Sequence, residues 1–375
     1  MIPLNQNLNT LKRSSIRRYT NLARETEDCA MLTIGEPDFD TPENIRAAAV
    51  AAITGNQTHY APNQGTPDLR QAVANYETAR GNETKPENVL ITIGACHGLF
   101  TALLGILNAG EEVIVPTPGF LLYDSIATVA GAKTVPLDIS KTGFQIAKEA
   151  LDEHITDKTK AIIINSPCNP SGTVFSRESL ENVKQAILGK PIFLIVDNVY
   201  NQLSFTDCPD LSLDAELKEQ TILCQSFSKP WAMTGWRVGY LICPEYVMDR
   251  LLLLSAAEIT AVPTFIQAAA VEALKTDPTP MREIYRKRRD YVCRRLDEMG
   301  LRYPKPEGAF YVFVDISRFG MTSEEFCTRM IHEGKLAAVP GSCFGTEGFI
   351  RLSYCYSDAE LEKALNRLED FIGKL

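Results

Sequence analysis

The sequence has few of the residues from which metal centres are built. Only four histidines occur among its 375 residues, and its ten cysteines include no Cys-x-x-Cys pair. Structural zinc sites rely on such pairs and on histidine, so no zinc framework is expected. Cys224 and Cys243 lie within apolar runs and are expected to behave as small buried hydrophobic residues. The sequence therefore predicts no metal site.

Signals for export and for membrane insertion are also missing. The first twenty residues, MIPLNQNLNTLKRSSIRRYT, lack the apolar core of a secretory signal. The longest aliphatic run covers residues 251–254 and is far shorter than the ~20 residues that span a bilayer. Free thiols without an export signal favour the cytoplasm, and no membrane partner is expected.

The charge balance and the absence of repeats narrow the possible functions further. The formal net charge is -9, whereas proteins that bind nucleic acids favour a basic face, so no nucleic-acid partner is expected. We find no internal repeat, low-complexity segment or flexible linker. A chain of 375 residues with 45% hydrophobic content is long enough for one large and one small domain. An acidic total still permits a local basic pocket for an anionic ligand.

Compact apolar runs alternate with helical patterns along most of the chain. Buried strands are predicted at 89–93, 113–115, 161–164, 192–196 and 221–224, and helices at 98–107, 178–188 and 263–274. This alternation predicts an α/β fold with a mostly parallel sheet covered by helices on both faces. A long charged helix at 281–299 precedes a separate, smaller α+β unit. Its predicted elements are strands at 311–314 and 349–352 and helices at 324–332 and from residue 358.

The strongest functional signal is a lysine framed by small hydroxyl residues. Lys229 follows Ser226 and Ser228, and Arg237 lies a few positions further on. A lysine amine can form a Schiff base with an aldehyde, while serine hydroxyls and an arginine can hold a phosphate. Arg237 is also expected to lower the pKa of Lys229 by like-charge repulsion. The segment predicts an aldehyde cofactor that carries a phosphate; the alternative is a surface lysine beside a buried aromatic cluster.

Two further segments follow predicted strands. Asp197 ends the strand at 193–196, and strand ends are where sites lie in open α/β sheets. Gly94, Ala95 and Cys96 follow the strand at 89–93 and open a helix, whose backbone N–H groups can bind phosphate. Each signal is weak alone: Asp197 could cap a turn, and no G-x-G-x-x-G or P-loop motif occurs.

These segments together resemble the class I and II pyridoxal-phosphate-dependent aminotransferases, the fold type I or aspartate aminotransferase superfamily. The run at 226–240 is similar to the family's cofactor-lysine segment, N-S-P-C-N-P-S-G at 165–172 to its Asn-Pro turn, and I-R-L-S-Y at 350–354 to its R-L-S-Y-A segment. The resemblance extends from about Gly35 to Tyr354. It implies a large domain of residues 46–280 that binds pyridoxal 5'-phosphate. Residues 1–45 and 281–375 would form the small domain.

The resemblance also implies how the cofactor is held. Lys229 would be the covalent anchor and general base, and Asp197 would keep the ring nitrogen protonated. Tyr200 and Asn169 would hydrogen-bond the ring oxygen, and Phe120 would cover the ring, unless it is a plain core residue. The phosphate would contact Gly94, Ala95, Cys96, Ser226, Ser228 and Arg237.

Three more residues acquire expected roles from the resemblance. Tyr60 would reach the phosphate of the neighbouring subunit, which implies a homodimer with shared active sites. Arg351 would grip the substrate α-carboxylate bidentately; the alternative is a surface ion pair. Asn169 would also contact the substrate, and Gly35 belongs to a loop that closes over it.

The expected activity is amino-group transfer from an L-amino acid to a 2-oxo acid by a ping-pong mechanism. The alternatives are a carbon–sulfur β-lyase of the cystathionine lyase type and, less favoured, a non-catalytic regulator. Cys96 stands where related aspartate aminotransferases carry a lysine for a second carboxylate, and Asn198 replaces a usual glutamate. Dicarboxylate specificity is therefore not implied. Aromatic, branched, methionine-like and N-acyl-diamino substrates all remain open.

Overall fold

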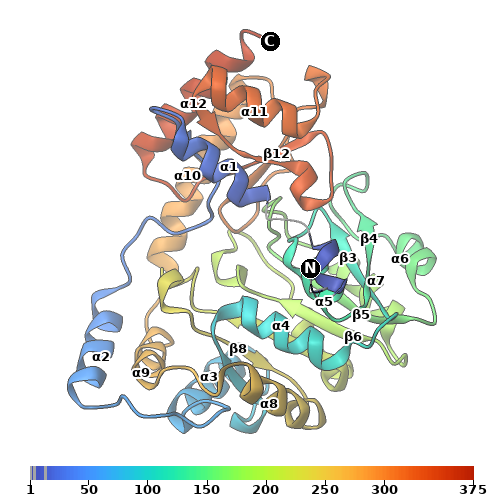
Figure 1. The fold of residues 1–375 in the computed structure, drawn as a ribbon, viewed down its shortest axis with the longest axis vertical. Helices are drawn as coiled ribbons and strands as arrows, with labels where there is room; N and C mark the ends of the chain where they lie inside the picture. The colour runs from blue at the N-terminus through green and yellow to red at the C-terminus, as the bar shows by residue number, and fades with distance from the viewer. Residues whose placement is uncertain (1, 3–5, 12–14) are drawn as a thin grey trace.

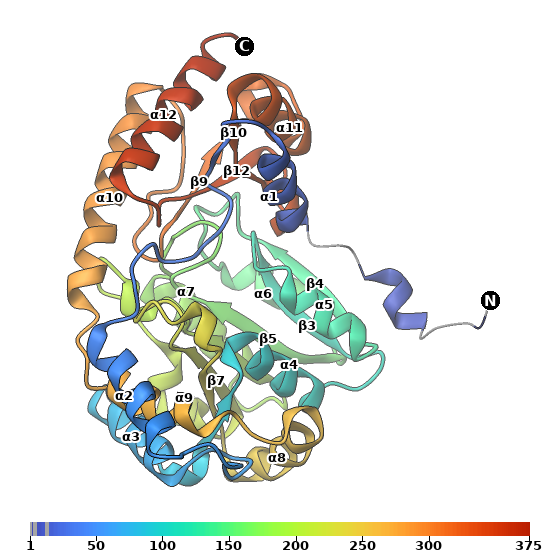
Figure 2. The same ribbon diagram turned by 60° about the vertical axis from the view of Figure 1, so that its left-hand side comes forward.

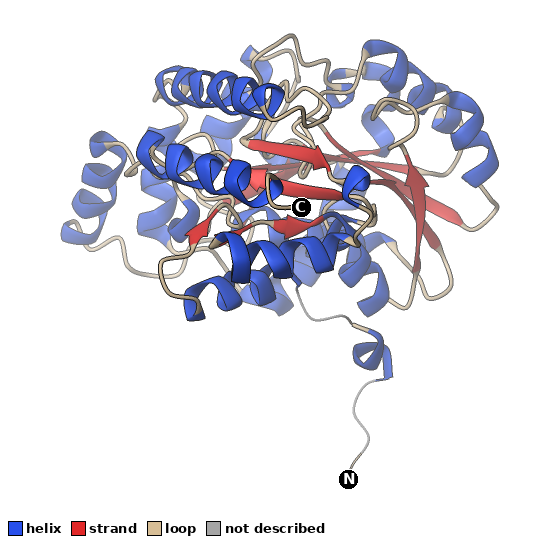
Figure 3. Cartoon of the chain, turned by 90° about the horizontal axis from the view of Figure 1, so that it is seen from above, coloured by secondary structure: helices blue, strands red, loops and turns tan. Residues whose placement is uncertain are grey.

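The computed structural model describes residues 2, 6–11 and 15–375. Figure 1 shows two bodies of secondary structure, one above the other. The lower body contains a seven-stranded sheet, and the upper body contains a three-stranded sheet flanked by the C-terminal helices. The view from above in Figure 3 shows strands in the interior with helices around them.

The large sheet has the strand order β2-β8-β7-β6-β5-β3-β4. Its strands are β2 (Val89–Thr92), β3 (Glu112–Thr117), β4 (Lys133–Asp138), β5 (Thr159–Asn165), β6 (Phe193–Asp197), β7 (Thr221–Ser226) and β8 (Gly239–Ile242). The pairs β3–β4, β3–β5, β5–β6 and β6–β7 are parallel, whereas β8 is antiparallel to both of its neighbours. The predicted mostly parallel sheet is confirmed.

Successive residues of the central strands belong to different hydrophobic cores. In β5, Ile162 and Ile164 pack in one cluster, while Ala161 and Ile163 pack in another on the opposite face. Side chains of a strand point alternately to its two faces. Both faces are therefore buried, which explains why these strands appear in the sequence as continuous apolar runs.

Helices cover both faces of this sheet, as predicted. One core cluster includes side chains of α2 (Glu43–Thr54), α3 (Pro67–Ala79), α6 (Lys148–His154), α7 (Arg177–Ile187) and α9 (Thr264–Ala273). The other includes side chains of α4 (Gly94–Ile106), α5 (Leu122–Val129) and α8 (Glu245–Ile259). Local sequence sets some helix starts: Thr66 and Ser176 each accept a hydrogen bond from a backbone N–H of the first turn of α3 and α7.

The upper body has its own sheet and core. Its antiparallel sheet, in the order β11-β12-β9, consists of β9 (Tyr311–Asp315), β11 (Val339–Pro340) and β12 (Phe349–Ser353). Around it lie α10 (Thr279–Glu298), α11 (Ser323–Gly334) and α12 (Asp358–Ile372), which Figure 2 shows beside the sheet. Their apolar side chains form a third core cluster.

The N-terminal segment packs against this upper body. The short strand β1 (Ala30–Met31) pairs in parallel with β10 (Leu336–Ala337), and α1 (Ser15–Glu25) contacts α11. Figure 2 shows α1 and α11 side by side. The domain limits expected at residues 45/46 and 280/281 fall inside α2 and α10. The division itself stays a prediction.

Candidate active site

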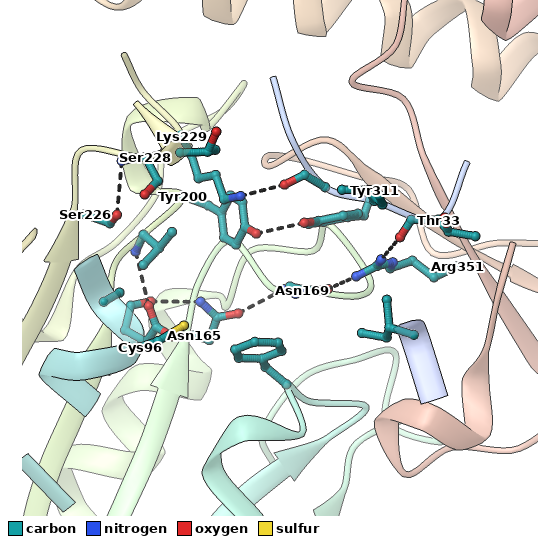
Figure 4. A pocket seen from close by; sticks show the side chains of 18 of the residues that line it. Thr33, Cys96, Asn165, Asn169, Tyr200, Ser226, Ser228, Lys229, Tyr311 and Arg351 are labelled. Carbon is teal, nitrogen blue, oxygen red and sulfur yellow. Dashed lines mark hydrogen bonds between the residues drawn. The ribbon is translucent and has the colours of Figure 1, made fainter. Parts of the chain in front are cut away.

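A cavity of about 660 Å³ lies where neighbouring parallel strands end. Asn165, Asp197 and Ser226 are the last residues of β5, β6 and β7, and all three line it. Since the carboxyl ends of parallel strands meet at one edge, polar residues there share a site. Residues of α1, α4, α5, β9 and β12 and of several loops also line it (Figure 4).

Asp197 is buried on the floor of the cavity and hydrogen-bonded. Tyr123 donates its phenolic hydrogen to Asp197 Oδ2 at 2.7 Å, and the backbone N–H of Val199 donates to Oδ1 at 3.3 Å. Burial raises the pKa of Asp197 to about 6, and the bond from Tyr123 opposes that rise. A carboxylate held this way can pair with a cationic ring nitrogen. Tyr123 was not identified from the sequence, where no motif marks it.

Lys229 projects its amine into the cavity, as Figure 4 shows. Its Nζ donates a hydrogen bond to the carbonyl of Gly35 at 2.5 Å. The pKa of Lys229 is lowered to about 8, mainly by burial and to a smaller extent by the charge of Arg351, against the opposing effects of Cys355 and Glu36. We expected Arg237 to help lower this pKa; the main cause is burial, and the charge that adds to it is that of Arg351. An amine with this pKa is partly neutral near physiological pH, and hence nucleophilic.

The predicted phosphate ligands gather at the start of α4. Gly94 has φ +68°, a backbone conformation that favours glycine, and a Cβ there would lie 2.8 Å from Nη2 of Arg237. Arg237 Nη1 donates to the carbonyl of Thr234 at 2.8 Å. The first backbone N–H groups of a helix lack acceptors within the helix, so this turn has donors to offer an anion.

The remaining predicted phosphate ligands also line the cavity. These are Ala95, Cys96, Ser226 and Ser228. The Ser226 hydroxyl accepts a hydrogen bond from the Ser228 backbone N–H at 3.1 Å, which orients the loop that leads to Lys229. The donor set therefore fits a phosphate group next to a reactive lysine.

Arg351 is a buried guanidinium without a counter-charge. Its side chain, on β12, donates from Nη1 to Asn169 Oδ1 at 2.8 Å and from Nη2 to the carbonyl of Thr33 at 2.5 Å. It is only 2% exposed, its Nε has no partner, and no carboxylate pairs with it in residues 15–375. The alternative of a surface ion pair is therefore wrong. A buried, unpaired cation is costly, and an anionic ligand would relieve that cost.

Aromatic side chains form the wall between Lys229 and Arg351. The hydroxyls of Tyr200 and Tyr311 are 2.9 Å apart, and the guanidinium of Arg351 lies 4.4 Å from the centre of the Tyr311 ring. Phe120 lines the cavity and meets the Tyr123 ring edge-on at 5.9 Å. The sequence did not identify Tyr311, which reads there as an ordinary apolar strand residue.

Gly35 lies at the cavity, whereas Tyr60 does not. A Cβ on Gly35 would be 1.7 Å from the Tyr311 hydroxyl, so the loop can approach this closely only with glycine. Tyr60 is 92% exposed and is not among the residues that line the cavity. Its predicted role concerns a neighbouring subunit and stays a prediction.

Helix α1 contributes residues that the sequence did not identify. Arg17, Asn21 and Arg24 line the cavity, and Thr20 does so beside Thr33. Nothing in the local sequence distinguishes these residues from the solvated face of an amphipathic helix. In the described part of the chain, no helix has the length and apolarity to cross a bilayer, and no group of three or more histidine, cysteine or acidic residues is arranged to hold a metal ion.

Comparison with known proteins adds independent findings. A family model described as aminotransferase class I and II matches residues 27–368. The chain is 39% identical to a probable N-acetyl-LL-diaminopimelate aminotransferase of Bacillus subtilis, over 99% of this chain and 96% of the relative. It is 38% identical to an aspartate aminotransferase of Pyrococcus abyssi, over 98% and 97%. The solved structure of aspartate aminotransferase from Thermus thermophilus with maleate superposes with a TM-score of 0.94, at 34% identity and with 99% of this chain and 100% of that chain covered.

Proposed function

The chain belongs to the class I and II aminotransferases, and on that premise we propose how its cavity transfers an amino group from an L-amino acid to a 2-oxo acid. The proposal is a ping-pong reaction supported by pyridoxal 5'-phosphate in the cavity. One observation carries it: the amine of Lys229, with its lowered pKa, shares a cavity with the unpaired guanidinium of Arg351. The two relatives reported above are named aminotransferases, not lyases, so the β-lyase alternative lacks support.

The residues present fit the cofactor. The turn at Gly94, which a Cβ would fill, would hold the phosphate together with Ser226, Ser228 and Arg237. Asp197 would pair with the ring nitrogen. Ala95 and Cys96 would add backbone donors, Asn169 and Tyr200 would contact the ring oxygen, and Phe120 would lie against the ring. Pyridoxal phosphate, when bound, supplies an aldehyde that takes up the amino group and a ring that withdraws electrons from the α-carbon.

Side chains and backbone of the protein move the proton, hold the substrate and limit the access of water. Lys229 Nζ, once it is free as a neutral amine, accepts the proton from the substrate α-carbon and delivers it again. Arg351 holds the α-carboxylate with two N–H donors, which fixes the α-carbon relative to Lys229. The loop at Gly35 covers the amine from above and limits the access of water.

A Lys229→Ala variant tests the proposal. Wild-type protein mixed with pyridoxal phosphate should develop the absorption band of a lysine-bound aldehyde, and the variant should not. Transfer from a panel of amino acids to 2-oxo acids should fall by at least about 10²-fold, the usual contribution of a general base. Lys141→Ala, at an exposed turn, is the matched control and should behave as wild type. A variant that keeps both the band and the activity would refute the assignment of Lys229.

We also propose a homodimer in which Tyr60 completes the neighbouring site. The support is its exposure of 92% on a loop outside its own cavity. Mixing Tyr60→Ala with Lys229→Ala chains tests the arrangement. In hybrid dimers one site combines an intact Lys229 with an intact Tyr60 from the partner, so activity should recover to about a quarter of wild type at statistical mixing. If each site is complete within one chain, mixing gives no recovery.

We further propose that residues 46–280 form the large domain and that residues 1–45 and 281–375 together form the small domain. The support is that the two sheets have separate hydrophobic cores. The placement in the cytoplasm remains the prediction made from the sequence.

A further inference from the structure

One segment of backbone contacts both of the groups on which the proposed function depends. Residues 33–39, which we call the strap, contain no helix or strand and lie between β1 and α2. The Gly35 carbonyl accepts a hydrogen bond from Lys229 Nζ, and the Thr33 carbonyl accepts one from Arg351 Nη2, each at 2.5 Å. Figure 4 shows Thr33 next to Arg351. Because the two carbonyls are only two residues apart, a shift of the strap would displace the amine and the guanidinium together.

The middle of the strap is held by single hydrogen bonds. The Ile34 N–H donates to the Tyr356 hydroxyl at 3.2 Å, and the Ile34 carbonyl accepts from Cys355 Sγ at 3.3 Å. On the other side, the Thr234 hydroxyl donates to Glu36 Oε1 at 2.5 Å in an exposed contact. Single bonds of this kind leave a segment free to pivot, so the position of the strap depends on its far end.

The far end of the strap is fixed by an ion pair. Arg288 of α10 donates from Nη1 and Nη2 to the two carboxylate oxygens of Asp38, at 2.7 and 2.8 Å. Its Nε donates to Asp358 at the start of α12, at 3.0 Å. The Arg288 guanidinium is buried and lies 5.3 Å from the centre of the Phe39 ring. A bidentate pair fixes orientation as well as distance, and Figure 2 shows the chain descending to α2 beside α10.

The packing of α10 against α12 does not require this contact with the strap. Arg295 lies seven positions after Arg288, about two turns further along α10. It binds Glu369 of α12 at 2.9 Å. The pair between Arg288 and Asp38 therefore adds a link from the two helices to the strap.

We propose that Arg288 is a positioning residue for amino-group transfer. Its ion pair with Asp38 holds the strap in place, and the two strap carbonyls in turn hold the amine and the guanidinium that the reaction needs. This assignment rests on the proposed roles of Lys229 and Arg351. Arg288 itself is not among the residues that line the cavity, so it acts through the strap. Such positioning matters because a displacement of about 1 Å can cost on the order of 10²-fold in rate.

The reactivity of Lys229 in the cofactor-free protein tests the assignment without any substrate. Only a neutral amine reacts with acetic anhydride. Labelling at a series of pH values, followed by mass spectrometry of the peptide that carries Lys229, therefore gives the pKa of its amine. That pKa should be about 8 in the wild type.

Two strap variants, Arg288→Gln and Asp38→Asn, should raise the pKa of Lys229. A loosened strap admits water, and burial is the main cause of the lowered pKa. The loss of burial outweighs the effect of Glu36, which opposes it and moves with the strap. The expected rise is roughly one unit, a fraction of what full burial can cause.

Kinetics supply the second readout. For any amino donor and 2-oxo acid that the wild type accepts, kcat/KM should fall on the order of tenfold in both strap variants. Arg288→Lys keeps the charge without the bidentate geometry, so it should recover part of the loss. Arg288→Gln/Asp38→Asn should be no worse than either single variant, because both substitutions break the same pair.

Two control variants separate the strap from the packing of the helices. Arg295→Gln removes an ion pair between α10 and α12 that does not involve the strap. Asp358→Asn removes the other carboxylate partner of Arg288, which is exposed. Both should leave the labelling profile of Lys229 unchanged and change kcat/KM by less than about twofold.

Each outcome decides the matter. An unchanged pKa of Lys229 in both strap variants would overturn the assignment, and so would an equal shift in Arg295→Gln or a shifted pKa without any loss of kcat/KM. If Arg288→Gln does not fold, Asp38→Asn decides in the same way. If the wild type transfers no amino group while the pKa of Lys229 still depends on Arg288 and Asp38, the proposed function fails and the action of Arg288 on the strap stands.

Discussion

Tyr123 allows a quantitative test of the electrostatics of the cavity. Its phenol donates to Asp197 Oδ2 at 2.7 Å, and this bond opposes the rise in pKa that burial causes. With both effects present, the pKa of Asp197 is raised to about 6. Tyr123→Phe removes only the phenolic oxygen, so the pKa of Asp197 should rise further.

The size of that rise follows from the strength of the bond. A hydrogen bond to a charged group contributes about 1.5–3 kcal/mol, and one pKa unit corresponds to about 1.36 kcal/mol. The pKa of Asp197 should therefore rise by roughly one to two units. If Asp197 must lose its proton to pair with the cofactor, the starting pKa of about 6 implies roughly twofold to tenfold weaker cofactor binding by the variant at about pH 7.

The decisive result is the pH range in which Tyr123→Phe binds the cofactor more weakly than wild type. The carboxyl group of Asp197 is protonated below its pKa, so the deficit in cofactor affinity is present at lower pH. It disappears as the pH rises above the pKa of the variant, and at about pH 9 the titration should cost almost nothing. A difference in cofactor affinity that remains at high pH and does not change with pH reports other effects of the substitution.

The assay is the dissociation constant of pyridoxal phosphate, measured by absorbance titration between about pH 6 and pH 9. Tyr246→Phe is the matched control, because that exposed tyrosine donates to the carbonyl of Glu219 away from the cavity. An affinity ratio between Tyr123→Phe and wild type that is the same at every pH would refute the reasoning.

Three further substitutions have clear expected outcomes. Gly35→Ala brings a Cβ to 1.7 Å from a tyrosine hydroxyl, so urea denaturation should show a loss of about 1–3 kcal/mol in the free energy of unfolding. Gly235→Ala is the control, because a Cβ there meets nothing within 4 Å, and it should change the free energy of unfolding by less than about 0.5 kcal/mol. Equal losses in the two alanine variants would contradict the steric argument. Arg351→Met removes a charge that contributes, after burial, to the lowered pKa of Lys229, so the pH at which the cofactor-free protein captures pyridoxal phosphate should move upward; an unshifted capture profile would count against this coupling. His97→Ala removes the hydrogen bonds that His97 makes with the half-buried carboxylate of Glu258 and with the backbone N–H of Ile93, so thermal unfolding should show a loss of about 1–3 kcal/mol in the free energy of unfolding. An unchanged melting temperature would show that these bonds contribute nothing.

The sheet was predictable because its central strands are buried on both faces. In β5 and β6, residues 161–164 and 193–196 are continuous apolar runs, and each ends at a polar residue that faces the cavity. Short runs of this kind, rich in β-branched residues and bounded by polar residues, favour strands that are buried on both faces. The antiparallel direction of β8 was not predictable, since Gly239–Ile242 is apolar in the same way and pairing partners are not encoded in a single strand.

The predicted site residues that line the cavity share one property: each lies in a segment with a recognisable local pattern. Lys229 follows two serines, Asp197 ends a strand, and Gly94 opens a helix. Tyr123 and Tyr311 lack such a pattern. Their roles come from contacts with residues more than seventy positions away in the chain, as the bonds from Tyr123 to Asp197 and between Tyr311 and Tyr200 illustrate.

The sequence by itself determined the class of fold, the reactive lysine and the groups around it, because strand patterns and short motifs are local. The tertiary structure alone decided two other matters. Burial, and not a neighbouring charge, is the main reason that the pKa of Lys229 is lowered to about 8. The packing of α1 against α11 places Arg17 and Arg24 on the cavity. Desolvation and the meeting of distant side chains depend on how the whole chain packs, so no local pattern can encode them.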